Sequence, residues 1–91
     1  MPLLTRFQLA CEQALEELLE HRGLALSNRA IVSNGETFFH ATITERDVEV
    51  WIYDDEAELH CGRNRRNFEA AVFADESERV AAFIKELDSM F

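Results

Sequence analysis

Basic residues, cysteine and long apolar runs are scarce in this sequence, and each scarcity excludes a class of function. Nine Lys and Arg stand against eighteen Asp and Glu, which gives a formal net charge of −9 at pH 7. A protein that binds nucleic acid directly must neutralise phosphates, so direct nucleic-acid binding is not expected. No run of about 18 apolar residues is present, so no segment is expected to cross a membrane. The excess of acid suits solubility, and an acidic balance is ordinary for a cytosolic protein. It also suits a partner that is itself basic, because opposite charges steer two proteins together.

The sequence holds only two cysteines, Cys11 and Cys61, and they form no Cys-x-x-Cys pair. Neither a zinc site nor a redox motif is predicted, and no metal or other cofactor is expected. Each cysteine falls on the apolar side of its expected element, where a reduced thiol behaves as a small hydrophobic group. Buried thiols suit a reducing compartment. Since the N-terminal segment is also too charged for a signal peptide, we expect the protein in the cytoplasm.

The apolar content is sufficient for a single core. Hydrophobic residues make up 47% of the 91 residues, and seven of them are Phe. A chain of this length is expected to form one domain, residues 1–91, in which burial offsets the entropy of ordering the chain.

Apolar residues recur at three- and four-residue spacing near both ends of the chain, which predicts two amphipathic helices. The first is expected over residues 3–22, closed by Arg22 and Gly23. The second is expected over residues 76–90, where Asp75 and Glu78 have the spacing of a capping box. The apolar stripes consist of Phe7, Cys11, Ala14, Leu15, Leu18 and Leu19 in the first helix, and of Val80, Phe83, Ile84, Leu87 and Phe91 in the second.

The middle of the chain alternates in the manner of β-strands. Asn34-Gly35 is the strongest hairpin signal in the chain, and Asp54-Asp55-Glu56 is a second turn. Residues 62–67 are predicted as a loop, and residues 68–73 as either a short fifth strand or an extended connection. The predicted strands are residues 29–33, 37–44, 47–53 and 57–61.

Short hairpin connections make such a sheet antiparallel, and two amphipathic helices need a common apolar surface to cover. The sequence therefore predicts an α+β fold. It is a two-layer sandwich in which a meander of four or five strands carries the N- and C-terminal helices on one face. The strand residues expected to face the helices and form the core are Phe39, Ala41, Ile43, Val48, Val50, Ile52, Leu59 and Cys61.

The opposite face of this sheet should be polar, yet it collects large rings. A bare aromatic patch of several hundred Å² is near the upper end of what a monomer exposes. Three explanations remain open: cover from within the chain, by residues 24–34 or by a register slip near Asp47; a protein interface; or a small-molecule site. The outward residues are Phe38, His40, Trp51, Tyr53 and His60.

The candidate chemical groups on this face are weak signals for an enzyme. His40 and His60 could act as base and acid or as two metal ligands, but no third ligand has a recognisable spacing. Cys61 and His60 are neighbours on a strand and point to opposite faces, which argues against a Cys–His dyad. We therefore expect no catalytic residues and no metal site.

Two charged clusters flank the predicted fourth strand. One cluster is acidic and consists of Asp54, Asp55, Glu56 and Glu58. It is either a solvated turn or an acidic surface that orients a basic partner. Arg63, Arg65 and Arg66 could hold an anion weakly, because guanidinium groups form paired hydrogen bonds, or they could simply balance nearby acid.

The leading hypothesis is a small, acidic, non-enzymatic protein-binding module, such as an inhibitor, an immunity-type protein or an accessory protein. Phe38, Trp51 and Tyr53 would anchor the partner, with His40 and His60 beside them. One alternative is a small-molecule-binding protein or small enzyme that uses the same aromatic and histidine face. The other is a homodimer formed through that face.

Overall fold

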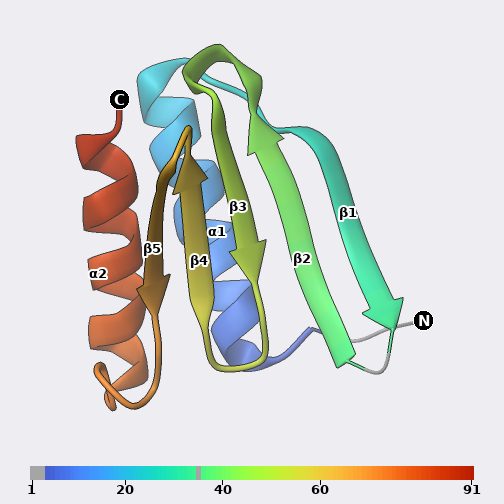
Figure 1. The fold of residues 1–91 in the computed structure, drawn as a ribbon, viewed down its shortest axis with the longest axis vertical. Coiled ribbons are helices and arrows are strands. Elements are labelled where there is room, and N and C mark those ends of the chain that lie inside the picture. Colours follow the sequence, from blue (N-terminus) through green and yellow to red (C-terminus); the bar gives the residue numbers. More distant parts are fainter. Residues whose placement is uncertain (1–3, 35) are drawn as a thin grey trace.

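A computed structural model describes residues 4–34 and 36–91 and shows a helix, a five-stranded antiparallel meander and a second helix (Figure 1). The strands lie in the order in which they occur in the chain, and each pairs with the next. This confirms the predicted α+β fold, and of the four or five strands expected the sheet has five. The elements are α1 (Arg6–Arg22), β1 (Ser27–Asn34), β2 (Glu36–Ile43), the 3₁₀ turn η1 (Thr44–Arg46), β3 (Val48–Ile52), β4 (Ala57–Cys61), β5 (Asn64–Phe68) and α2 (Glu76–Ser89).

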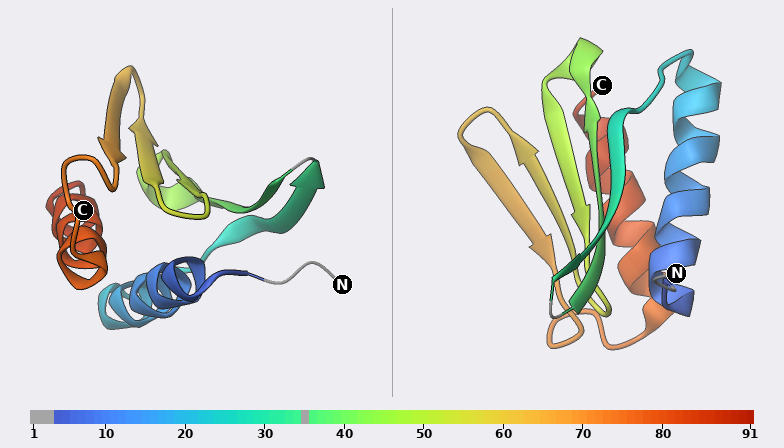
Figure 2. Two further views of the ribbon diagram at one scale, coloured as in Figure 1. Left: turned by 90° about the horizontal axis from the view of Figure 1, so that it is seen from below. Right: turned by 90° about the vertical axis from the view of Figure 1, so that its right-hand side faces the viewer.

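Both helices pack on one face of the sheet, as predicted, and leave the other face uncovered (Figure 2). Every second strand residue points towards the helices and is buried between the two layers. Burying a side chain of Leu, Ile or Phe size contributes about 1.5–3 kcal/mol. Of the predicted inward strand residues, all are fully buried except Cys61, which is half-buried. The helices add Phe7, Cys11, Leu15, Leu19, Phe83 and Leu87 to the same core.

Helix α1 begins at Arg6, a little later than its apolar pattern suggests, because Thr5 caps it. The Thr5 hydroxyl accepts a hydrogen bond from the backbone N–H of Gln8 (3.2 Å), and the Gln8 side chain accepts one from the N–H of Thr5 (2.7 Å). This reciprocal arrangement is a capping box. At the other end Gly23 takes a left-handed conformation with φ 67°, as its type and position predicted.

The predicted first strand, residues 29–33, is longer than expected. Strand β1 pairs regularly with β2 from Ala30 to Asn34 and irregularly between Ser27 and Ala30, where Asn28 has a φ of 52°. Asn34 lies opposite Glu36, as a hairpin requires, while Gly35 of the predicted turn lies outside the described residues. Because β1 is the edge strand of the sheet, this segment does not fold back over the outer face.

The predicted loop at residues 62–67 is wrong. Gly62, with a φ of 60°, and Arg63 form a tight turn, and β5 runs from Asn64 to Phe68 beside β4. The sequence does not predict this strand because polar residues occupy the positions facing both sides of the sheet. The alternation of apolar and polar residues that indicates a half-buried strand is therefore absent. The segment after Phe68, predicted as strand or connection, is a connection.

Helix α2 begins after Asp75, whose carboxylate accepts a hydrogen bond from the backbone N–H of Glu78 (3.1 Å). One turn into this helix, Arg79 is 6% exposed and lies over the ring of Phe7, 4.8 Å from its centroid. Its guanidinium donates to the backbone carbonyls of Phe73 and Asp55 at 2.9 and 2.8 Å, and more weakly to that of Ala74. Arg79 thereby ties α2 to α1 and to the turn between β3 and β4.

Neither helix of the described chain is long and apolar enough to cross a membrane.

Candidate functional site: the outer face of the sheet

The outer face of the sheet carries the predicted aromatic cluster. Phe38 and His40 lie on β2, Trp51 on β3 and His60 on β4, and Tyr53 follows the end of β3. The register places His40 opposite Trp51 without a slip, although Asp47, just before β3, has a φ of 54°. The five side chains are each half-buried, so the cluster is neither in the core nor fully open to solvent.

The rings pack against one another across three strands. Trp51 lies between His40, whose ring centroid is 4.4 Å away and nearly parallel, and His60, at 4.4 Å and tilted by 45°. His60 is the diagonal neighbour of Trp51, since it lies opposite Glu49. Phe38 and Tyr53 form a second pair with centroids 5.4 Å apart. These contacts hold the rings of the cluster in two preformed groups on the same face of the sheet.

The two histidines differ in their hydrogen bonds. The Nε2 atom of His60 lies 2.7 Å from a carboxylate oxygen of Glu58. The Nε2 atom of His40 is buried and has no hydrogen-bond partner among the described residues.

Glu58 is the polar centre of this face rather than an exposed acid. It is 5% exposed, and its carboxylate contacts both His60 and the guanidinium of Arg65. Burial by itself would raise the pKa of Glu58, but the hydrogen bonds from His60 and Arg65 outweigh it and hold the pKa below its ordinary value. Of the four acidic residues expected to steer a partner, Glu58 therefore serves instead to position His60 and Arg65.

Replacing Glu58 with glutamine should make the protein less stable at pH 7, by about 1–3 kcal/mol, since hydrogen bonds to a charged group are lost. A carboxyl with a lowered folded pKa stabilises the fold above its unfolded pKa, and that stability is lost as the pH falls through the folded pKa. We thus expect the stability difference between the two proteins to shrink from pH 6 towards pH 3. Urea unfolding at several pH values measures it, and a difference that stays constant would contradict the assignment.

The remaining acidic residues lie at the turn between β3 and β4. Asp54 and Asp55 are exposed, and Glu56 is half-buried. Burial, and then the neighbouring carboxylates of Glu69, Glu58 and Asp55, raise the pKa of Glu56. A hollow of about 540 Å³ borders the aromatic cluster and is lined by Tyr53, Asp54, Asp55, Glu56 and Glu58.

The backbone fixes the position of this acidic turn. The backbone N–H of Tyr53 donates to the carbonyl of Glu56 at 2.7 Å, which closes the turn. The Asp54 carbonyl accepts from the Thr5 hydroxyl, and the Asp55 carbonyl accepts from Arg79. Hydrogen bonds therefore connect the turn to the starts of both helices. They fix the position of the backbone that carries its carboxylates.

The three arginines predicted as a weak anion site do not converge. Arg65 lies on the outer face and is engaged by Glu58, whereas Arg66 points to the helix side, where its Nε lies 3.4 Å from Glu86. Arg63 lies in the tight turn that precedes β5. Their alternation along a strand separates the side chains that a loop would have brought together.

Both cysteines lie on the core side of the sheet. Cys61 packs against the core while His60 stacks on Trp51, so the two point to opposite faces, as predicted. Burial raises the pKa of Cys11 to about 12, which keeps it a thiol and not a nucleophilic thiolate. Within residues 4–34 and 36–91, no three His, Cys, Asp or Glu side chains are grouped closely enough to hold a metal ion.

These features define the chain as a small α+β protein with a preformed aromatic outer face and an acidic turn beside it. Comparison with protein-family models, with curated proteins and with solved structures gave no significant match.

Proposed function

We propose that this chain is a small, acidic, non-enzymatic protein-binding module of the cytoplasm. It uses the outer face of the sheet as its interface and serves as an inhibitor, an immunity-type protein or an accessory protein. The observation that carries this proposal is the His40–Trp51–His60 stack, half-buried on a sheet face that neither helix covers. The cytoplasmic location rests on the two free cysteines, which suit a reducing compartment.

A preformed aromatic surface is well suited to binding another protein. Trp and Tyr dominate the binding energy of protein interfaces, because they bury a large area with few rotatable bonds. Rings that already pack against one another lose little further freedom when a partner covers them. Trp51, Phe38 and Tyr53 would then be the central contacts, with His40 and His60 at their sides.

The acidic turn gives this interface a preferred partner. Asp54 and Asp55 are exposed at the border of the aromatic cluster, and the whole chain has a formal charge of −9. A partner with a basic surface would be attracted at long range and oriented by these carboxylates. We therefore propose a basic partner that is oriented by Asp54, Asp55 and Glu56, without a contribution from the buried Glu58.

Replacing Trp51 with alanine tests the interface. We expect affinity for the partner to fall at least about thirtyfold, which corresponds to about 2 kcal/mol. The experiment is capture from native cell lysate at low salt, with the captured protein then purified and titrated against both forms. Two ring contacts are also lost, at about 0.5–1.5 kcal/mol each, so the stability of the isolated protein is measured in parallel.

The matched control is Val72→Ala, which removes a large apolar side chain that is 73% exposed on the connection before α2. It should leave binding unchanged. A second variant, Asp54→Asn with Asp55→Asn, should slow association at low salt without affecting stability. The proposal fails if Trp51→Ala binds normally, or if its loss of binding is fully explained by unfolding.

Two other readings of the same face lead to different results. A small-molecule site would show stabilisation by a ligand in a thermal-shift screen, because a ligand that binds only the folded state raises its stability. A homodimer through this face would sediment as a dimer at micromolar concentration, and Trp51→Ala would make it monomeric.

A further inference from the structure

The edge strand β1 presents a second surface that the outer face does not include. Within the described chain, β1 pairs with β2 alone, so every second residue directs a backbone N–H and C=O away from the sheet. The regular part of this edge runs from Ala30 to Asn34 and carries no charged residue. Natural proteins usually protect such an edge with charges, prolines or bulges, because it is a template for another strand.

Protection is present only at the start of this strand. The irregular pairing between Ser27 and Ala30, together with the φ of 52° at Asn28, disrupts the first half. Beyond it, Ile31 faces the helix layer, yet it remains 45% exposed. In Figure 2, β1 lies at the end of the sheet farthest from α2, on the side where α1 lies. Among residues 4–34 and 36–91, β2 is therefore the one strand that pairs with the second half of β1.

The flank of α1 beside this edge is acidic. Leu9, Glu12, Glu16 and Glu20 follow one another at three- and four-residue spacing and so share one face of the helix. Arg29 reaches across from β1 and forms ion pairs with Glu12 and Glu16. Glu20 makes no ion pair with any described residue, and Leu9 is 53% exposed. This face thus offers an apolar residue at one end and an unpaired carboxylate at the other.

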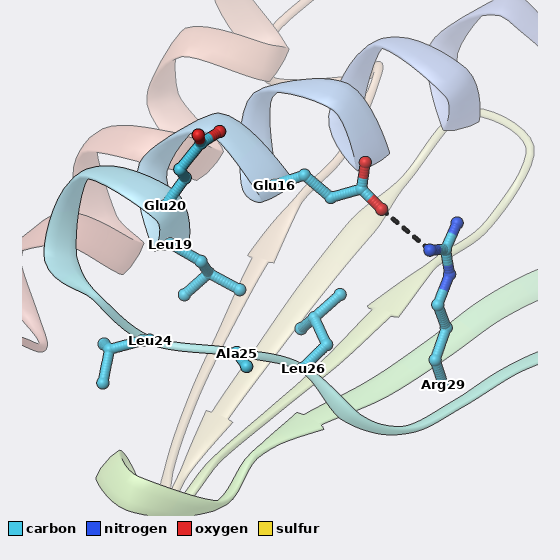
Figure 3. Close-up of a pocket in the computed structure, with 7 residues that line it drawn as sticks. All are labelled: Glu16, Leu19, Glu20, Leu24, Ala25, Leu26 and Arg29. Carbon is cyan, nitrogen blue, oxygen red and sulfur yellow. Dashed lines mark hydrogen bonds and ion pairs between the residues drawn. The ribbon is translucent and has the colours of Figure 1, made fainter.

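A hollow lies at the acidic end of this flank (Figure 3). It has a volume of about 400 Å³ and opens between the last turns of α1 and the start of β1. Leu19, Leu24 and Leu26 line its apolar part. Glu16 and Glu20 are on its rim, and Arg29 is held there by Glu16 at 2.8 Å. It can accommodate the stem of a long basic side chain whose charged end meets Glu20.

We propose that the β1 edge binds an extended, basic segment of a partner protein as an added strand. The segment would pair with Ala30–Asn34 and place an apolar side chain against Leu9 and Ile31. Its basic end would pass the bulge of β1 and meet Glu16 and Glu20.

The spacings of helix and strand agree with this arrangement. Successive glutamates of α1 are four residues apart, or about 6 Å along the helix. Alternate residues of a strand are about 6.6 Å apart, so two basic side chains on one face of the segment can each meet a glutamate. Arg29 already makes this contact from within the sheet. Backbone pairing gives the affinity of such complexes, and the pockets for alternate side chains give the specificity.

A second copy of the chain is a poorer occupant of this edge. Each copy carries a net charge of −9, and Arg29, the basic residue nearest this edge, is already paired to the glutamates of its own helix. The strand that such a copy would add, its β1, contains no basic residue besides Arg29. A basic segment supplies the charge that the flank lacks.

The probe is a capped peptide of sequence Lys-Lys-Thr-Val-Thr-Val-Thr-Lys-Lys, titrated into the ¹⁵N-labelled full chain at low salt. Lysines at both ends allow either strand direction. We expect the amide signals of Ala30–Asn34 to shift, and their hydrogen exchange to slow, as the added strand forms. The same peptide methylated on alternate backbone nitrogens should not bind, because its paired edge has lost its donors.

Variants of the chain distinguish the contribution of backbone pairing at the β1 edge from that of the acidic residues on α1. Ile31→Lys should abolish peptide binding, because an inward-pointing lysine is how natural edges are blocked. Val72→Lys is the matched control. Glu20→Gln should weaken binding about twofold to fivefold, whereas Glu17→Gln, on another face of the same helix, should have no effect.

Equal binding of the two peptides, or signals that shift only around Trp51, would overturn the proposal. So would concentration-dependent protection of the β1 amides in the chain alone that Ile31→Lys abolishes, since a second copy would then occupy the edge. The inference stands independently of the outer-face interface, and Asp54→Asn with Asp55→Asn, on the turn between β3 and β4, should bind the peptide as the unmodified chain does.

Discussion

Replacing Arg79 with alanine is expected to lower the free energy of unfolding by about 3–5 kcal/mol. The guanidinium is 6% exposed and donates to the carbonyls of Phe73 and Asp55 at 2.9 and 2.8 Å. Its removal leaves both carbonyls without this donor and opens a space against the ring of Phe7, over which it lies. Urea and thermal unfolding measure the loss, and a fall in Tm of more than about 12 °C is expected for a chain of this size.

Two further variants show which property of Arg79 matters. Lysine keeps the charge, but its single ammonium group cannot reach several carbonyls at once or stack on Phe7 as a planar group does. Arg79→Lys should therefore recover no more than about half of the loss. Lys85→Ala removes an exposed cation from the same helix and should change stability by less than about 0.5 kcal/mol. An Arg79→Ala protein as stable as Lys85→Ala would show that the hydrogen bonds are not formed.

The same arginine connects stability to the proposed interface. Its bond to the Asp55 carbonyl holds the turn that presents Asp54 and Asp55 beside the aromatic cluster. Loss of this bond frees one side of the turn, while the bond from the Thr5 hydroxyl to the Asp54 carbonyl remains. A partner that is oriented by the carboxylates of this turn should then associate more slowly with Arg79→Lys, even where that variant is folded.

Much of the fold could be predicted because its signals are local. Periodic apolar residues identified both helices, and alternation identified β2, β3 and β4, because each of these elements buries one side in a single core. Strand β5 was not predicted because Arg65 and Arg66, which face opposite sides of the sheet, are both polar. One of them is satisfied by Glu58 on the outer face and the other by Glu86 of α2. Contacts of this kind join distant parts of the chain and leave no periodic pattern.

The candidate site was predicted in outline and corrected in detail. Parity alone placed Phe38, His40, Trp51 and His60 on one face. The structure brings the rings of His40, Trp51 and His60 together and pairs Phe38 with Tyr53. Parity cannot say how rings pack, so the sandwich of Trp51 between two histidines was not foreseen. Glu58 was expected to be exposed because it is charged. Its burial depends on His60 two residues away and on Arg65 from the next strand.

The buried polar residues of the helices left a signal that could have been found. Gln8 precedes Cys11, Leu15 and Leu19 by 3, 7 and 11 residues, which puts it on the buried stripe of α1. Arg79 precedes Phe83 and Leu87 by 4 and 8 residues in α2. A polar residue that falls on an apolar stripe indicates a buried hydrogen-bonding group, because it must find partners inside the protein. Both residues are buried and fully engaged in this way.

Gln8→Ala is the second substitution expected to have a large effect, with a loss of about 2–4 kcal/mol in the free energy of unfolding. The Gln8 amide donates to the carbonyls of Thr37 at 2.7 Å and Ile52 at 3.2 Å, and its oxygen accepts from the N–H of Thr5. One side chain thus joins the start of α1 to β2 and β3. Alanine would remove this donor from both carbonyls and remove half of the capping box. Denaturant unfolding at pH 7 measures the change.

Methionine at position 8 separates the hydrogen bonds from the volume of the side chain. It fills nearly the same space as glutamine but has no donor, so Gln8→Met should be nearly as unstable as Gln8→Ala if the hydrogen bonds dominate. Gln13→Ala, an exposed glutamine of the same helix, controls for helix propensity and should be close to neutral. A Gln8→Met protein as stable as the unmodified chain would assign the role of Gln8 to packing. The link from α1 to the strands that carry Trp51 and His40 would then have to come from the apolar core alone.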